Sequence, residues 1–144
     1  VLEPGTSLAV VGANGTGKST FLRLLAGLIA PGRGYVFVDG QNLAQMDNKW
    51  WQEQIIYLPQ EPGFLPLSIR ENILLGREVE DDDLQKAIEL AGLTHFLIYS
   101  PQGLETILLD GGLNLPVGIR KRIALARAIL KPGKIVIMDD PTAS

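Results

Sequence analysis

Residues 7–29, SLAVVGANGTGKSTFLRLLAGLI, decide the fold, because they predict a strand, a glycine-rich loop and a helix in immediate succession. Residues 7–11 are almost all apolar, which is typical of a strand buried on both faces. The loop that follows fits the pattern G-x-x-x-x-G-K-[ST], in which backbone N–H groups surround phosphate oxygens. After Lys18, apolar residues recur at helical spacing up to residue 29. The loop therefore leads to a helix N-terminus, where free N–H groups and the helix dipole favour anions.

The side chains of this loop predict a site for ATP and Mg²⁺. Lys18 would neutralise the β and γ phosphates, and the Ser19 hydroxyl would bind the Mg²⁺ that bridges them. A glycine turn without a ligand is the alternative, but the lysine, hydroxyl, strand and helix all stand where phosphate binding needs them. The predicted nucleotide-binding residues of the loop are Gly12, Ala13, Asn14, Gly15, Thr16, Gly17, Lys18, Ser19 and Thr20.

Length and composition are those of one globular domain. The chain has 144 residues, 46% of them hydrophobic, and a formal net charge of −3, which argues against a general nucleic-acid surface. We therefore expect no nucleic-acid partner. The absence of cysteine excludes disulfides and thiolate metal sites, and no apolar stretch is long enough to span a bilayer. Both ends look cut, since residue 1 enters within a predicted hairpin and Ser144 follows directly on Asp-Pro-Thr.

Two further strands are predicted in the first half of the chain. Residues 34–40 predict a strand closed by a turn, and residues 54–58 predict an apolar strand with Gln60 just beyond its end. Trp50 and Trp51 lie in the polar segment between them. Such aromatics can cover a nucleotide base, but packing between layers is the commoner use, and we expect packing here.

Helices dominate the middle of the chain. Ser68 and Glu71 form an S-x-x-E capping box for a helix over residues 69–75. The three aspartates at 81–83 favour the N-terminus of another helix, and cation binding by them is the less favoured alternative. His95 has no second ligand at local spacing, so we interpret it as structural or solvated.

The last part of the chain predicts a helix followed by a strand. In the helix over residues 117–130, apolar positions line one face, and we interpret its basic residues, including Arg127, as a solvated face. Residues 134–138 predict a second doubly buried strand that delivers Asp139 and Asp140 to its C-terminal end. Ligands gather at that edge of open parallel sheets, so we expect Asp139 to meet the same Mg²⁺ as the phosphate loop.

Several of these segments resemble the nucleotide-binding domain of ATP-binding cassette (ABC) transporters, and the resemblance covers nearly the whole chain. GANGTGKST is similar to the Walker A motif of that family, IVIMDDPTAS to its Walker B motif and the start of its D-loop, and YLPQ ends in its Q-loop glutamine. RKRIALARAIL closely resembles the helix that follows the signature motif. PLSIRENI and LETILLDGGLNL look like the corresponding segments of exporter domains.

The resemblance implies an α/β fold, with a P-loop NTPase core built on a RecA-like, mostly parallel sheet and truncated at both ends. The core would comprise residues 1–33 and 115–144, with a small β portion over 34–60 and a helical subdomain over about 68–114. It also implies a second such domain, packed head to tail with ATP between the two. Dimer closure would drive a transmembrane domain, usually fused to the chain, and place this domain at the cytoplasmic face of the membrane.

The resemblance also assigns residues to roles. Asp140, Gln60 and Lys18 match the catalytic positions, while Ser19, Gln60 and Asp139 match the metal ligands. Leu115, Pro116, Val117 and Gly118 stand where the signature motif contacts the nucleotide of the partner domain.

The sequence departs from the family pattern in three respects. The chain has Leu-Pro-Val-Gly-Ile at 115–119 where the family has Leu-Ser-Gly-Gly-Gln, and Asp140 where the family has the catalytic glutamate. No aromatic residue precedes Gly12 to stack on adenine, and the switch histidine is expected outside this sequence.

The leading interpretation is an ATPase subunit of an exporter. The alternatives are a catalytically weak ATP-binding module with a more active partner, and a soluble ABC ATPase of DNA repair or translation.

Overall fold

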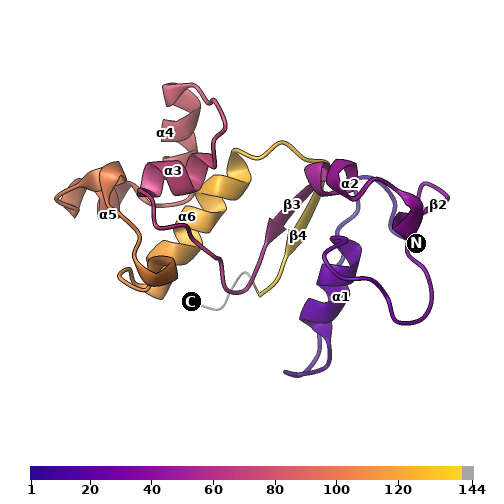
Figure 1. The fold of residues 1–144 in the computed structure, drawn as a ribbon. Coiled ribbons are helices and arrows are strands. Elements are labelled where there is room, and N and C mark those ends of the chain that lie inside the picture. The colour runs from indigo at the N-terminus through magenta and orange to yellow at the C-terminus, as the bar shows by residue number, and fades with distance from the viewer. Residues whose placement is uncertain (141–144) are drawn as a thin grey trace. The chain divides into compact units, whose positions relative to one another are not determined.

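The structure is a computed structural model that describes residues 1–140 (Figure 1). The chain forms two compact units, one over residues 1–52 and one from residue 53 onward. Residues 141–144, which include the expected start of the D-loop, lie outside the described residues.

The first unit contains the predicted loop and its helix. Helix α1 spans Lys18–Leu25, shorter than the predicted run to residue 29. It ends because Gly27 adopts a left-handed φ of 69°, so that its N–H reaches the Leu24 carbonyl and the N–H of Leu28 reaches the Arg23 carbonyl. The remaining elements are an antiparallel hairpin of β1 (Phe37–Val38) and β2 (Gln41–Asn42), the 3₁₀ helix η1 (Leu43–Gln45), and α2 (Asn48–Gln54).

Trp51 packs against the end of α1, as its interpretation as a packing residue predicts. Its side chain is only 5% exposed, and its indole N–H donates to the Leu25 carbonyl at 3.0 Å. A Cβ atom at Gly27 would lie 2.9 Å from the Trp51 ring, so the helix ends on a glycine for steric as well as conformational reasons. Trp50, by contrast, is exposed.

The second unit joins a two-stranded parallel sheet to a cluster of helices. In the sheet, β3 (Ile55–Leu58) pairs with β4 (Ile135–Met138). Helices α3 and α4 both pack against α6 (Figure 1). The helical elements are α3 (Ile69–Leu74), α4 (Asp81–Leu90), α5 (Thr94–Tyr99), η2 (Gly103–Glu105), η3 (Asp110–Gly112) and α6 (Val117–Ile129). Their buried apolar side chains include Ile69, Ile73, Leu84, Ile88, Leu93, Leu108 and Ile123.

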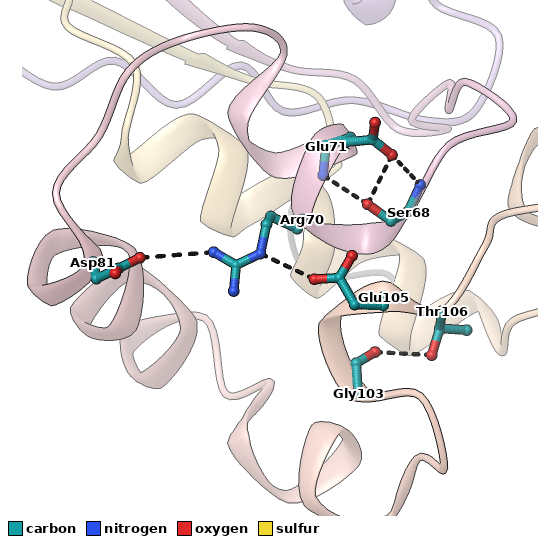
Figure 2. A network of polar contacts seen from close by, with 7 residues as sticks. All are labelled: Ser68, Arg70, Glu71, Asp81, Gly103, Glu105 and Thr106. Carbon is teal, nitrogen blue, oxygen red and sulfur yellow. Dashed lines mark hydrogen bonds and ion pairs between the residues drawn. The ribbon is translucent and has the colours of Figure 1, made fainter.

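Polar contacts around α3 confirm the predicted capping box (Figure 2). The Glu71 N–H donates to the Ser68 hydroxyl oxygen at 3.1 Å, and the Glu71 carboxylate accepts from the Ser68 N–H at 2.8 Å. Arg70 then links α3 to its neighbours, because its guanidinium pairs with Asp81 at the start of α4 and with Glu105 in η2. The aspartates at 81–83 occupy the first turn of α4, where they complement the helix dipole.

Two sequence-based expectations about strands are wrong for the described residues. Residues 7–11 form no strand, because within residues 1–140 the only ladders are β1–β2 and β3–β4, and a strand exists only by pairing. β4 forms as predicted but is not buried on both faces, since Val136 is 55% exposed and only Ile137 is buried. β4 has one ladder partner among these residues, so its apolar side chains lack the neighbours that would cover them.

The capping box generates a stability prediction. Ser68→Ala should lower the free energy of unfolding by about 1 kcal/mol, because it removes the acceptor for an otherwise orphaned helix N–H. Urea denaturation of the protein at neutral pH measures this loss. Equal midpoints for Ser68→Ala and the unmodified protein would contradict the structural role of the cap.

The carboxylate of the same box gives a pH signature. Hydrogen bonds from the Ser68 backbone and hydroxyl lower the pKa of Glu71 below its ordinary value of 4.5. A lowered folded pKa adds stability that is present above the unfolded pKa and is lost as pH falls through the folded one. The stability difference between the unmodified protein and Glu71→Gln should therefore be largest near neutral pH and shrink towards pH 3. A difference that is constant with pH would contradict this assignment.

Candidate functional site

The loop over residues 12–17 has left-handed backbone conformations at two of its glycines. Gly15 and Gly17 have φ values of 81° and 90°, in the left-handed region that residues with a Cβ atom rarely adopt. Gly17 is also the N-cap of α1, and the Thr16 hydroxyl donates to the Ala13 carbonyl at 2.9 Å. The turn is therefore tightened by Thr16 and delivers the chain directly into the helix.

Lys18 lies folded back over this loop. Its ammonium group donates to the carbonyl oxygens of Gly12 at 2.9 Å and Ala13 at 2.8 Å. The first turn of α1 contains no acidic residue, whereas α4 has three aspartates there. The start of α1 thus combines a positive side chain, the positive end of a helix dipole and no built-in anion, an arrangement that suits phosphate.

In the second unit, the register of the sheet brings predicted site residues to one edge. Leu58 pairs with Met138, so Gln60 and Asp140 each lie two residues beyond paired strand ends. The Gln60 side-chain amide donates to the Asp140 carboxylate at 3.4 Å, which joins two of the three predicted catalytic residues. The Asp139 N–H extends the ladder to the Leu58 carbonyl at 2.8 Å, and Asp139 is only 6% exposed.

The donors at this edge fit Mg²⁺. Among residues 1–140 no three His, Cys, Asp or Glu side chains gather closely enough to hold a metal on their own. Mg²⁺ in nucleotide sites needs only one or two carboxylates, with phosphate and water oxygens completing its shell. The buried Asp139 carboxylate and the Gln60 amide oxygen are ligands of that kind, so the chemistry of the donor set agrees with the prediction.

Residues 115–118, which the resemblance places at the signature position, lie at the start of α6. Pro116 is the N-cap residue, in an extended conformation with φ −55° and ψ 145°, and provides no side-chain hydrogen bond to the helix. Leu115 is buried, while Val117 is exposed. The segment therefore presents a helix N-terminus and Gly118, without a hydroxyl donor.

Sequence reasoning missed the partly buried contacts of Arg127, which it interpreted as part of a solvated face. The Arg127 guanidinium donates to the backbone carbonyls of Asn72 at 2.8 Å and Gly63 at 3.2 Å, and lies 5.1 Å from the centroid of the Phe64 ring. The signal was present in the spacing, because residue 127 is one helical turn after Ile123, which is completely buried.

Comparisons with known proteins agree with this geometry. Residues 1–143 match the family model described as "ABC transporter". The chain belongs to the ABC transporter family. ABC transporter B family member 1 of Arabidopsis thaliana is 39% identical over 97% of the chain, which spans only 11% of that relative. Mycobactin import ATP-binding/permease protein IrtB of Mycolicibacterium thermoresistibile is 35% identical over 99% of the chain and 25% of its own length.

A solved structure supports the same fold. A bacterial Atm1-family ABC exporter with ATP bound has a TM-score of 0.84 and 30% identity, over 91% of this chain and 23% of the exporter chain. The α/β fold that the resemblance implies is therefore confirmed as the ABC ATPase fold. None of the helices described within residues 1–140 is both long and apolar enough to span a membrane.

The geometry of the loop generates a binding prediction for this ABC domain. Lys18→Ala should raise the dissociation constant for Mg-ATP by about 10- to 100-fold, because a charge-assisted hydrogen bond contributes about 1.5–3 kcal/mol. Isothermal titration calorimetry on the full-length protein measures the change. Lys49→Ala, which removes an exposed lysine from α2, is the matched control and should leave the affinity unchanged. Equal affinities for Lys18→Ala and the control would contradict the phosphate role of the loop.

Proposed function

We propose that this chain is the ATP-binding and ATP-hydrolysing part of a membrane exporter. The observation that carries the proposal is the edge of the β3–β4 sheet, where Gln60 and Asp140 meet beside the buried Asp139. The chain also carries a phosphate loop with Lys18 folded onto its carbonyls. In the proposed function, these residues would serve as a base, a water-positioning amide, a metal-binding carboxylate and a phosphate-binding cation, which are the parts that phosphoryl transfer needs.

Each of these residues has a separate task in the proposed reaction. Bound Mg²⁺ would neutralise charge on the β and γ phosphates, with Ser19, Gln60 and Asp139 as its protein ligands. Lys18 would hold the same phosphates. Asp140 would accept the proton of the attacking water, and the Gln60 amide would orient that water, because its hydrogen bond already directs it towards Asp140. Asp139 would act only through the metal.

The proposed assembly is a head-to-tail dimer with a second ABC nucleotide-binding domain, attached to a transmembrane domain at the cytoplasmic face. The similarity of the chain to parts of much longer transporters, including one named an ATP-binding/permease protein, supports a fused membrane domain. The same similarity disfavours the soluble ATPase of DNA repair or translation. Within the domain, we propose a core over residues 1–33 and 115–144, a β portion over 34–60 and a helical subdomain over about 68–114.

A catalytically weak ATP-binding module is the second candidate, and two departures favour it. Asp140 is one methylene shorter than glutamate, which draws the carboxylate back from the attacking water. Pro116 has neither a hydroxyl nor an N–H for the γ-phosphate of the partner site, and it stands at the start of α6 without a side-chain cap. In a head-to-tail dimer the first defect weakens the chain's own site and the second weakens the partner's site.

Restoring the family residues tests the two candidates against each other. If the site is weak, Asp140→Glu combined with Pro116→Ser, Val117→Gly and Ile119→Gln should raise ATP turnover by the assembled transporter at least about a hundredfold. A misplacement of about 1 Å can cost that much, and each donor to a developing charge adds a similar factor. ATP turnover by Asp140→Glu alone distinguishes the effect of the shorter acid at position 140 from the effect of the substitutions at positions 116, 117 and 119. Equal turnover by the unmodified and restored assemblies would contradict the weak-module candidate and support full activity.

A further inference from the structure

Arg127 joins the middle of α6 to the loop that runs from β3 to α3. It donates to the carbonyl oxygen of Gly63 in the loop and to that of Asn72 in α3. In the described part of the chain its hydrogen-bond partners are amide oxygens, and burial lowers the pKa of the guanidinium. A planar fork of N–H groups can bind two carbonyls at fixed angles, which a lysine ammonium cannot reproduce.

The Phe64 side chain also holds this loop in place. It is 9% exposed, its ring lies beneath the Arg127 guanidinium, and a Cβ atom at Gly112 would come within 2.9 Å of it. The loop is therefore held between α6 and η3 by a cation–π contact and by a glycine that leaves room for the ring. Any movement of α6 relative to the loop would have to displace this side chain.

Asn72 fixes the part of the loop nearest to α3. It is completely buried, its side-chain amide donates to the carbonyls of Leu65 and Leu67, and its side-chain oxygen accepts from the Leu65 N–H. Residues 63–67 are thus bound at several points to the helices. Gln60 is only three residues before Gly63, a span of at most about 10 Å of extended chain.

We propose that Arg127 is a positioning residue for hydrolysis: it holds the Gly63–Phe64 segment against α6 and thereby fixes Gln60 beside Asp140. The proposal rests on the function proposed above, because Gln60 acts there as the residue that orients water. Arg127 lies ten residues after Val117, about 15 Å along a rigid helix. A shift of the signature end of α6 would therefore reach Gln60 through Arg127 and Phe64.

Epistasis with Gln60 tests whether Arg127 acts through that residue. In the full-length transporter, Arg127→Met should lower kcat for ATP hydrolysis about tenfold and change KM for ATP less than twofold. In a Gln60→Ala background, Arg127→Met should have less than a twofold further effect. The same tenfold loss in both backgrounds would overturn the proposal, because a general structural defect acts without Gln60. A silent Gln60→Ala would overturn it as well.

Matched variants distinguish the loss of the Arg127 contacts with the loop from a general loss of stability in α6. Arg122→Met removes an arginine of the same helix that donates to the Gly92 carbonyl, and it should leave kcat unchanged. Phe64→Leu keeps an apolar side chain in place but removes the ring, so it should lower kcat about threefold, again only when Gln60 is present. This second variant carries the test if Arg127→Met fails to fold. A loss of kcat in Arg122→Met equal to that in Arg127→Met would overturn the proposal.

Hydrogen exchange provides a readout that does not depend on turnover. Arg127→Met should speed amide exchange in peptides covering residues 59–67 at least threefold and leave those covering residues 81–99 unchanged. Unchanged exchange over 59–67 would overturn the proposal even if ATP hydrolysis were lost. Conversely, faster exchange in a transporter that hydrolyses no ATP would contradict the proposed function and not the contact, so the two failures are distinguishable.

Discussion

Parallel pairing of β3 with β4 is the constraint on which the candidate catalytic edge depends. Strands 55–58 and 135–138 are far apart in sequence, and only their register brings Gln60 and Asp140 within 3.4 Å. A shift of the register by one residue would turn alternate side chains to opposite faces. The Asp139 N–H, which continues the ladder to the Leu58 carbonyl, holds that register to the point where the carboxylates begin.

The helical part of the second unit then determines where the loop leaving β3 can go. The loop has few regular backbone hydrogen bonds of its own, so buried polar side chains supply them, above all Asn72 and Arg127. Leaving a buried polar group unpaired costs about 1–3 kcal/mol, so such a network favours one conformation of the loop. Contacts with α3 and α6 therefore determine the position of Gln60 as much as its attachment to β3 does.

Local signals were readable from the sequence, and contacts between distant segments were not. The S-x-x-E box at Ser68 and Glu71 was predicted because both partners lie within one turn. The phosphate role of residues 12–20 stays a prediction that rests on contiguous residues alone. The burial of residues 134–138 was overestimated, because the burial of a strand depends on which other segments pack against it, and the strand's own sequence does not specify those segments. Arg127 was missed because its partners are 64 and 55 residues away, although its spacing from Ile123 marked the buried face.

Asp140 stands where the resemblance implies a glutamate, and its suitability for that position cannot be judged by side-chain length alone. Its backbone has a φ of 51°, in the left-handed region, where aspartate and asparagine are several-fold enriched among residues other than glycine. A short polar side chain can hydrogen-bond locally in that conformation, whereas a longer one gains less from it. Aspartate therefore suits the turn after β4 better than glutamate does, although its carboxylate reaches one methylene less far from the backbone. The residue at this position has to satisfy both the backbone and the chemistry, and in this chain the conformation of the backbone favours the shorter acid.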